Sequence, residues 1–389
     1  MESVDLAKAR QVVPGPRPEF WSGKRVLLTG HTGFKGAWTA LWLSRLGARV
    51  AGFALPADHP GTLYCAANIG DVCRCEIGDI RDRARLDAVV QSFRPHIVIH
   101  MAAQALVRRG VADPIGTFST NVLGTVNLLD VLRRTEELTD VLVVTSDKVY
   151  RNPGESAPMD EGAALGGADP YSASKAACEH VAHSFAATYF AAKGIRLATA
   201  RGGNVIGGGD RCEDRIIPDC VRALESGEPV RLRNPDAVRP WQHVLDCVSG
   251  YLTYVERLAS APDPANLPRA LNFGPPPGQQ LSVRELASLF FQAFGRSPGM
   301  IHDTGSDAIE SQALRLDSSR AHAQLGWSCL LSQRDAVRWT AEWYQGVRDR
   351  PDAARALAEQ QITAFAARLT GSTTDNEAFA ARAAEAESG

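Results

Sequence analysis

The sequence has no excess of charge of either sign and no long apolar run. Its 42 Lys and Arg residues are balanced by 44 Asp and Glu residues, which gives a net charge of −2. Proteins that bind nucleic acid or anionic membranes usually carry a basic surface. No apolar stretch approaches the ~20 residues needed to span a bilayer, and the polar, proline-containing start lacks the apolar core of a secretion signal. We therefore expect a cytoplasmic protein with no nucleic-acid or membrane partner.

The sequence also lacks an obvious arrangement of metal ligands. Its eight cysteines are scattered. Cys73 and Cys75 lie two residues apart, but no second pair completes a zinc-site spacing. The nine histidines do not cluster. We expect reduced thiols, as is usual for intracellular proteins, and no metal site.

The first half of the chain alternates apolar, β-branched runs with helical patterns, and a further strand pattern, RALNFGP, follows later. Near-continuous apolar strands separated by helices are typical of a parallel sheet that is covered on both faces. We therefore expect an α/β fold with a Rossmann-like doubly wound parallel sheet. The expected strands of the first half are residues 25–30, 48–55, 73–80, 96–103, 140–146 and 195–205.

Beyond Asn204 the pattern loosens into Gly-, Pro- and Arg-rich sequence. A helix is expected near 217–225, and Ser282 with Glu285 forms a capping-box pattern at the start of another. The last forty or so residues are rich in Ala, Arg and Glu. They favour a terminal helix with a frayed or disordered tail.

Three glycines follow the first expected strand and open the next helix. Gly30, Gly33 and Gly36 have the spacing G-x-x-G-x-x-G. A helix N-terminus presents free N–H groups and a positive dipole end to a pyrophosphate, and glycines let the backbone approach it closely. The pattern therefore predicts dinucleotide binding, with a tight turn that merely needs glycine as the alternative.

The residues alone do not choose between NAD and NADP. The ribose-binding carboxylate usually ends the second strand, but here that strand ends at Leu55 and the next carboxylate is Asp58. Asp79 follows the third strand. It is equally consistent with an adenine contact and with a helix cap.

Two short segments carry the catalytic chemistry. In YSASK, Tyr171 and Lys175 lie one helical turn apart on the same face. A phenol with a pKa near 10 becomes a usable base when a nearby ammonium and a cofactor's positive ring favour the phenolate. Ser146 ends the preceding strand, where a hydroxyl could help to hold an alkoxide. The alternative is a surface Tyr and Lys on an amphipathic helix.

Asp147 and Lys148 directly follow that serine. Residues at the carboxyl end of a strand in such a sheet face the ligand crevice. The two side chains offer an acid and a base for a substrate that has already been oxidised to a ketone, provided the pKa of Lys148 is lowered. The alternative is a solvated loop pair.

These segments resemble the extended short-chain dehydrogenase/reductase family. The resemblance runs from about Arg25 to Leu252 and rests on TGHTGFKGAW, HMAAQALVRR, TNVLGT, TSDKVYRN, YSASKAACEH, RGGNVIGGGD and RNPDAVRPWQHVLD. It implies NAD as the cofactor. It also implies contacts with the cofactor from Gly30, Thr32, Gly33, Phe34, Lys35, Gly36, Asp79, Ile80, Ala102, Ala103, Gln104, Asn121, Tyr171 and Lys175.

Within that family, an Asp-Lys pair after the strand resembles the hydro-lyases that dehydrate CDP-glucose. The resemblance implies that Tyr171 deprotonates the hydroxyl on carbon 4 while hydride passes to NAD. Lys148 then removes the proton of carbon 5, and Asp147 protonates the hydroxyl that leaves carbon 6. Hydride returns to carbon 6, which gives CDP-4-keto-6-deoxy-D-glucose. Such products feed deoxysugar and surface polysaccharide synthesis.

Substrate contacts are expected from the arginines Arg108, Arg215, Arg231 and Arg239, because guanidinium groups match phosphate oxygens. Each is equally consistent with a surface salt bridge. The resemblance adds Asn204 as a diphosphate contact and Gln104 and His243 as pocket residues. Trp241 could stack on a ring or belong to the core.

The predicted domains follow from these assignments. They are a flexible tail at 1–20, an NAD-binding domain at 21–204 to which 244–276 returns, a smaller discontinuous α+β substrate domain at 205–243 and 277–348, and a helical or disordered extension at 349–389.

Three other functions remain open at this point. They are a nucleotide-sugar 4-epimerase, a dehydratase of another nucleotide sugar, and a catalytically silent NAD-binding module. The resemblance implies a homodimer or a higher homo-oligomer, packed through the helix of Tyr171 and the helix after Pro114. Ala173, Ala176, Ala177 and Ala182 would permit close helix approach there.

Overall fold

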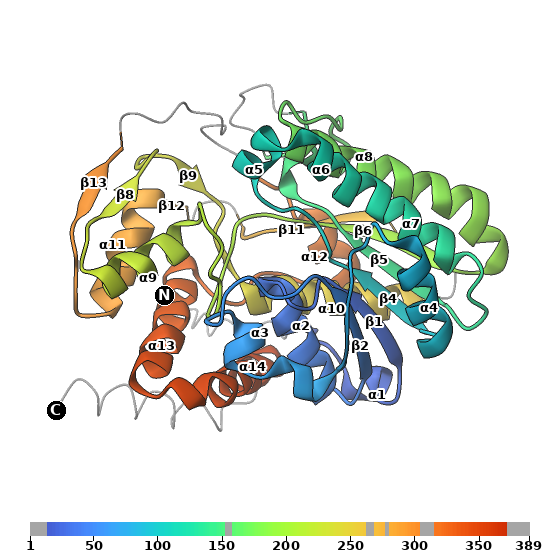
Figure 1. Cartoon of the computed structure of the whole chain (residues 1–389), viewed down its shortest axis with the longest axis horizontal. Helices are drawn as coiled ribbons and strands as arrows, with labels where there is room; N and C mark the ends of the chain where they lie inside the picture. Colours follow the sequence, from blue (N-terminus) through green and yellow to red (C-terminus); the bar gives the residue numbers. More distant parts are fainter. Residues whose placement is uncertain (1–13, 152–157, 262–267, 277–279, 304–314, 372–389) are drawn as a thin grey trace, which may run out of the picture.

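The computed structural model describes residues 14–151, 158–261, 268–276, 280–303 and 315–371. A seven-stranded sheet, with strand order β11-β6-β5-β4-β1-β2-β3 and every pair parallel, forms its centre (Figure 1). The strands are β1 (Arg25–Thr29), β2 (Arg49–Ala54), β3 (Arg74–Ile77), β4 (Ile97–His100), β5 (Asp140–Val144), β6 (Arg196–Gly202) and β11 (Ala270–Phe273). The predicted doubly wound parallel sheet is confirmed.

Helices cover both faces of the sheet because the central strands are apolar on both sides. On one face, Leu27, Val98 and Val141 belong to the same buried cluster as side chains of the helices packed there. On the other face, Val26 and Leu142 belong to a larger cluster. The first face is covered by α4 (Arg83–Phe93), α7 (Gly124–Leu132) and α8 (Pro170–Phe185), and the second by α2 (Phe34–Arg45), α10 (Val244–Ser260) and α12 (Ser319–Leu325).

A second, smaller unit stands over one end of the sheet (Figure 1). It pairs β8 (Val230–Leu232) with β13 (Met300–His302) and β9 (Val238–Arg239) with β12 (Leu281–Ser282). Its helices are α9 (Ile216–Ser226), α11 (Val283–Ala293) and α13 (Gln333–Asp349). The predicted capping box is confirmed, because Ser282 and Glu285 exchange side chain-to-backbone hydrogen bonds of 2.7 and 3.2 Å.

The helix expected after Pro114 is interrupted by a π turn. Asp113 caps α6 (Pro114–Phe118), the π turn spans Ser119–Leu123, and α7 continues it. The extra residue per turn is typical of functional sites. Here the buried side chain of Asn121 lies within the turn.

Both predicted terminal segments are packed against the molecule where the structure describes them. Residues 14–20 are the described part of the predicted N-terminal tail. Arg17 forms a 2.8 Å ion pair with the buried Glu256, and α1 (Pro18–Trp21) follows directly. At the other end, α14 (Ala354–Leu369) buries Phe365 against Trp42 of α2, with ring centroids 5.7 Å apart. The predicted frayed tail lies mostly beyond residue 371, outside the described residues.

Short elements complete the architecture. They are β7 (Val205–Ile206) paired with β10 (Gln242–His243), and the helices α3 (Leu63–Ala66) and α5 (Val107–Ala112). No helix in the described ranges combines the length and the apolar character needed to cross a bilayer.

Candidate active site

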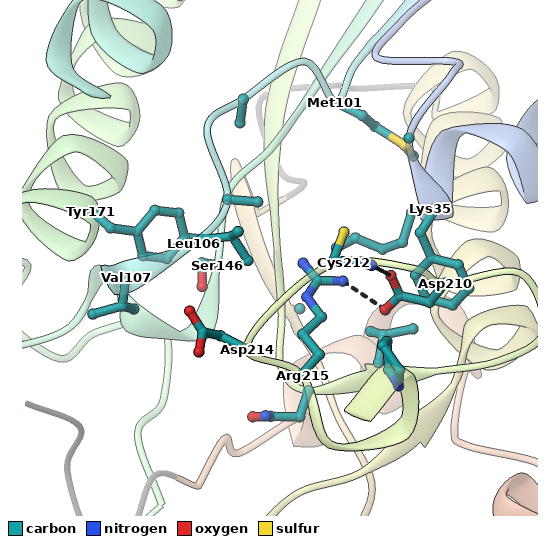
Figure 2. Close-up of a pocket in the computed structure, with 18 of the residues that line it drawn as sticks. Lys35, Met101, Leu106, Val107, Ser146, Tyr171, Asp210, Cys212, Asp214 and Arg215 are labelled. Atoms are coloured by element: carbon teal, nitrogen blue, oxygen red, sulfur yellow. Dashed lines mark hydrogen bonds and ion pairs between the residues drawn. The ribbon is translucent and has the colours of Figure 1, made fainter. Parts of the chain in front are cut away.

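A cavity of about 490 Å³ lies over the carboxyl ends of the central strands, and residues of the second unit also line it. The strand order reverses between β1 and β4, which is where doubly wound sheets bind ligands. Figure 2 shows Ser146 and Tyr171 on one side of this cavity, with Lys35 and Met101 on another. Arg215 and Asp214 reach into it from the segment before α9.

The glycine turn has the geometry that its sequence predicts. Gly30 has a φ of +79°, and a Cβ there would lie 2.7 Å from the backbone N of Ala102. A Cβ on Gly36 would lie 2.1 Å from the carbonyl oxygen of Gly30. Both contacts involve backbone atoms that cannot move aside, so only glycine permits this close packing of turn, helix and strand.

The N-terminus of α2 is open to an anion. Its N-cap is Gly33, which supplies no side-chain cap. The first N–H groups of a helix have no partner inside the helix. Together with the dipole they make the start of α2 chemically suited to an anion such as a pyrophosphate, and Gly33, Phe34 and Lys35 line the cavity there.

The edge of the cavity at β2 and β3 is mainly apolar. Leu55 continues β2, and its carbonyl accepts a 2.8 Å hydrogen bond from Thr32. Asp79 lines the cavity but is not the helix cap, because Asp82 caps α4 by accepting from the N–H of Arg85 at 3.0 Å. Arg81 pairs with Asp79 at 2.5 Å and holds the pKa of that carboxyl below its ordinary value.

Ser146, Tyr171 and Lys175 meet beneath the cavity. Tyr171 is 7% exposed, and burial raises the pKa of its phenol to about 12, opposed first by a hydrogen bond with Ser146. Arg215 also lowers this pKa, while Asp147 raises it. Lys175 is buried, donates to the carbonyl of Val144 at 3.2 Å, and has its pKa lowered by burial.

Asp147 is almost fully buried although it carries no direct salt bridge within the described residues. Oδ1 accepts a 2.9 Å hydrogen bond from Ser146, and Oδ2 has no hydrogen-bond partner within the described residues. Burial raises the pKa of this carboxyl, while Lys148, the Ser146 hydrogen bond, Lys35 and Arg239 oppose the increase. A carboxyl in such a place can keep its proton and act as an acid.

Several arginines face the cavity together, as their residue type predicts for a diphosphate site. Arg215 forms a 3.0 Å ion pair with Asp210, and Arg108 lies 4.0 Å from Asp214. Arg231 and Arg239 come from β8 and β9, and Asn204 lies between β6 and β7. Of the seven predicted substrate contacts, Gln104 and His243 do not line the cavity. The other five do: Arg108, Asn204, Arg215, Arg231 and Arg239.

Three predicted contact residues lie outside the cavity lining. His243 is fully buried, caps α10 and packs between Trp38 and Trp339. We therefore reassign His243 from a predicted pocket residue to a structural residue. Gln104 and Asn121 instead fix the loop that follows β4: Asn121 Oδ1 accepts from the N–H of Gln104 at 2.8 Å, and Gln104 Oε1 accepts from the N–H of Leu106 at 2.6 Å.

Part of the cavity wall consists of residues that were not predicted from the sequence. Arg233 and Asp214 form an ion pair at 2.5 Å, and Asp210 and Cys212 stand beside Arg215. Arg231 and Arg233 lie two residues apart in an extended segment, so the sequence could have predicted that their side chains point to the same side. Asp214 has a φ of +58°, and its carboxylate contacts both Arg108 and Arg233.

Comparisons with known proteins place the chain in one family. The model of a family described as "NAD dependent epimerase/dehydratase family" matches residues 26–272. A CDP-glucose 4,6-dehydratase of Salmonella typhimurium is 40% identical over 84% of this chain and 93% of its own length. A dTDP-glucose 4,6-dehydratase of Xanthomonas campestris is 26% identical over 83% of this chain and 95% of its own. The crystal structure of UDP-glucose 4-epimerase from Brucella ovis in complex with NAD is 26% identical, with a TM-score of 0.71 over 83% of this chain and 99% of that one.

Proposed function

This chain belongs to the NAD dependent epimerase/dehydratase family, and we propose that it converts CDP-D-glucose into CDP-4-keto-6-deoxy-D-glucose. The observation that carries the proposal is the buried Asp147 beside Ser146, with Lys148 next to it on the cavity wall. An enzyme that only oxidises or epimerises has no need of an acid and a base in addition to its Ser-Tyr-Lys set. The CDP-glucose dehydratase relative of Salmonella is 40% identical over most of the chain.

Oxidation at carbon 4 is the role of Tyr171. Bound NAD supplies the acceptor for the hydride and later returns it. As a phenolate, Tyr171 takes the hydroxyl proton, and Ser146 donates to the developing alkoxide. Lys175 lies one helical turn further on and would contribute positive charge to the binding of NAD. The buried position of all three excludes water, which favours charge transfer between fixed partners.

Elimination is the role of Asp147 and Lys148. A ketone on carbon 4 acidifies the proton of carbon 5, which Lys148 removes as the base. Burial raises the pKa of Asp147, so its carboxyl can hold the proton that the departing hydroxyl of carbon 6 needs. The loss of water is then an acid- and base-assisted step on the same wall as the oxidation.

The arginine group is the proposed binding site of the substrate diphosphate. The residues of this group all line the cavity: Arg108, Asn204, Arg215, Arg231 and Arg239. In the structure Asp214 is shared between Arg108 and Arg233. A diphosphate would compete with this carboxylate for the same guanidinium groups.

We also propose that the protein forms a homodimer in the cytoplasm. Val111, Ile115, Phe118 and Leu123 are exposed along the consecutive elements α5, α6 and the π turn, and Ile115 is 83% exposed. Contiguous exposed apolar side chains of this kind mark protein interfaces. Of the predicted interface alanines, Ala173 and Ala177 are half-buried, whereas Ala176 and Ala182 are buried inside the chain and are not available to a partner.

The test is mass spectrometry of sugar nucleotides incubated with the purified protein and NAD. We expect CDP-glucose to lose one water without net formation of NADH. An isomer with unchanged mass would indicate an epimerase, and no turnover of any sugar nucleotide would indicate a silent binding module. Exchanging both Asp147→Asn and Lys148→Met should abolish water loss, whereas an epimerase should largely tolerate the exchange.

A further inference from the structure

A cluster of one histidine and two cysteines lies behind the glycine turn, outside the cavity. One nitrogen of His31 and the sulfur atoms of Cys73 and Cys75 all lie within 4.8 Å of one another. The two sulfur atoms are 3.3 Å apart. None of these three residues lines the cavity, and none has a role in the proposed reaction.

His31 is a buried polar ring without a hydrogen bond. Its side chain is fully buried, and neither Nδ1 nor Nε2 has a partner in the described part of the chain. Buried polar groups are nearly always hydrogen-bonded, because leaving one unpaired costs roughly 1–3 kcal/mol. An imidazole in this situation has a free nitrogen lone pair that it can donate to a cation.

The backbone makes room for this ring. A Cβ on Gly52 of β2 would lie 2.2 Å from Cγ of His31, so glycine is required for the ring to rest against the strand. Tyr64 packs edge-on against the ring, with centroids 5.4 Å apart, and its hydroxyl donates to Cys75 at 3.4 Å. The ring and one thiol are therefore held by the same tyrosine.

The strand pattern points both thiols to the same side. Cys73 is in an extended conformation where the helical turn Ile69–Val72 ends, and Cys75 lies in β3. Residues i and i+2 of an extended segment share a face. The intervening Arg74 and the following Glu76 instead form an exposed 2.9 Å ion pair with each other.

We propose that His31, Cys73 and Cys75 bind a zinc-class divalent cation that ties the glycine turn to the edge of the sheet. Thiolate and imidazole are the ligands that Zn²⁺ prefers, and three protein ligands leave one of its four positions for water. Residues i and i+2 in a strand have Cα atoms roughly 6.7 Å apart, at the upper limit for a disulfide, so a shared ion bridges the thiols with less strain.

Cobalt titration of the full-length chain tests the site. The protein is reduced, stripped with a chelator and titrated with Co²⁺, then with Zn²⁺. We expect one equivalent of cobalt, a thiolate-to-cobalt charge-transfer band, and loss of that band when zinc displaces the cobalt. Cys73→Ser and Cys75→Ser should each abolish the band, whereas the control Cys329→Ser, which lies in the segment after α12, should keep it.

A second measurement uses the unaltered chain, so it does not depend on whether the variants fold. Alkylation of the eight thiols is mapped by mass spectrometry with and without Zn²⁺. We expect zinc to protect Cys73 and Cys75 and leave the labelling of Cys212 unchanged. The proposal is overturned if no charge-transfer band forms, if both serine variants keep it, or if the two thiols form a disulfide in mild oxidant and take up no metal.

Discussion

The hydroxyl of Ser146 donates a 2.9 Å hydrogen bond to Oδ1 of Asp147, which joins the proposed oxidation and elimination machinery through one contact. A hydrogen bond between Ser146 and Tyr171 also lowers the pKa of the Tyr171 phenol, whereas a negative charge on Asp147 raises that pKa. A protonated Asp147 therefore makes the phenolate easier to form. The same proton that later leaves with the hydroxyl of carbon 6 would favour the first step of the reaction.

Asp147→Asn should stop the reaction after oxidation. The amide keeps the shape of the side chain but has no proton to give to the leaving hydroxyl, and loss of a general acid typically costs about 10²–10⁴-fold in rate. We expect NADH to accumulate with CDP-glucose while water loss falls by that factor. Asp349→Asn, an exposed site paired with Arg348, is the control. Unchanged water loss in Asp147→Asn would contradict the assigned role.

The pH dependence of hydride transfer should move in opposite directions in two variants. Burial raises the pKa of Tyr171 to about 12, so the phenolate fraction, and with it the rate of oxidation, rises with pH below that value. Arg215→Met removes a charge that lowers this pKa and should shift the rising limb to higher pH. Asp169→Asn removes a charge that raises it and should shift the limb to lower pH. Single-turnover NADH formation measures both, and a shift of both variants in the same direction would refute the electrostatic account.

Gly36→Ala should destroy cofactor binding. Its Cβ would lie 2.1 Å from the carbonyl oxygen of Gly30, and the backbone there can respond only by opening the turn. Forced overpacking costs roughly 1–3 kcal/mol, and the displaced helix N-terminus no longer faces the pyrophosphate. In Gly274→Ala the nearest atom is 3.5 Å from the new Cβ, so that variant should retain NAD. Calorimetric titration with NAD compares the two, and equal affinities would be inconsistent with the proposed turn.

Glu179→Ala should strongly destabilise the fold beneath the active site. Glu179 receives a 2.8 Å ion pair from Arg201 and hydrogen bonds from Thr145 and Thr199, all buried. Removing one partner of a buried pair typically costs about 3–5 kcal/mol because the other charge stays unpaired. Urea unfolding should show this loss in the free energy of unfolding. The exposed pair of Arg348 with Asp349 should contribute less than about 1 kcal/mol. An equally small effect at Glu179 would contradict a stabilising role for its buried ion pair.

Ile115→Lys should convert the proposed dimer into a monomer. A charge placed on an apolar interface must be desolvated on association, and Ile115 is the most exposed large apolar residue of α6. Sedimentation at micromolar concentration measures the change. Ile301→Lys, at an exposed site on β13 in the second unit, should leave the oligomeric state unaffected. A monomeric unaltered protein would remove the basis for this interface.

Local chain geometry explains which parts of the site could be predicted. Gly30 and Gly36 follow a strand directly, and Tyr171 and Lys175 are one helical turn apart, so their relative positions depend on few residues. Arg233 and Asp214 meet only because the second unit folds over the sheet. His243 has the residue type of a pocket group, but two tryptophans enclose it. The buried position of the His31 ring depends on the space left by Gly52, which lies on a different strand.

The most direct test of the central claim follows the hydrogen on carbon 5. Incubation of the protein with NAD and CDP-glucose in D₂O should yield a product that has lost one water and carries deuterium at carbon 5, with the hydrogen of carbon 4 transferred to carbon 6. Such a product requires both the oxidation at Tyr171 and the elimination at Asp147 and Lys148. A product that keeps its water and carries no deuterium would contradict the dehydratase mechanism.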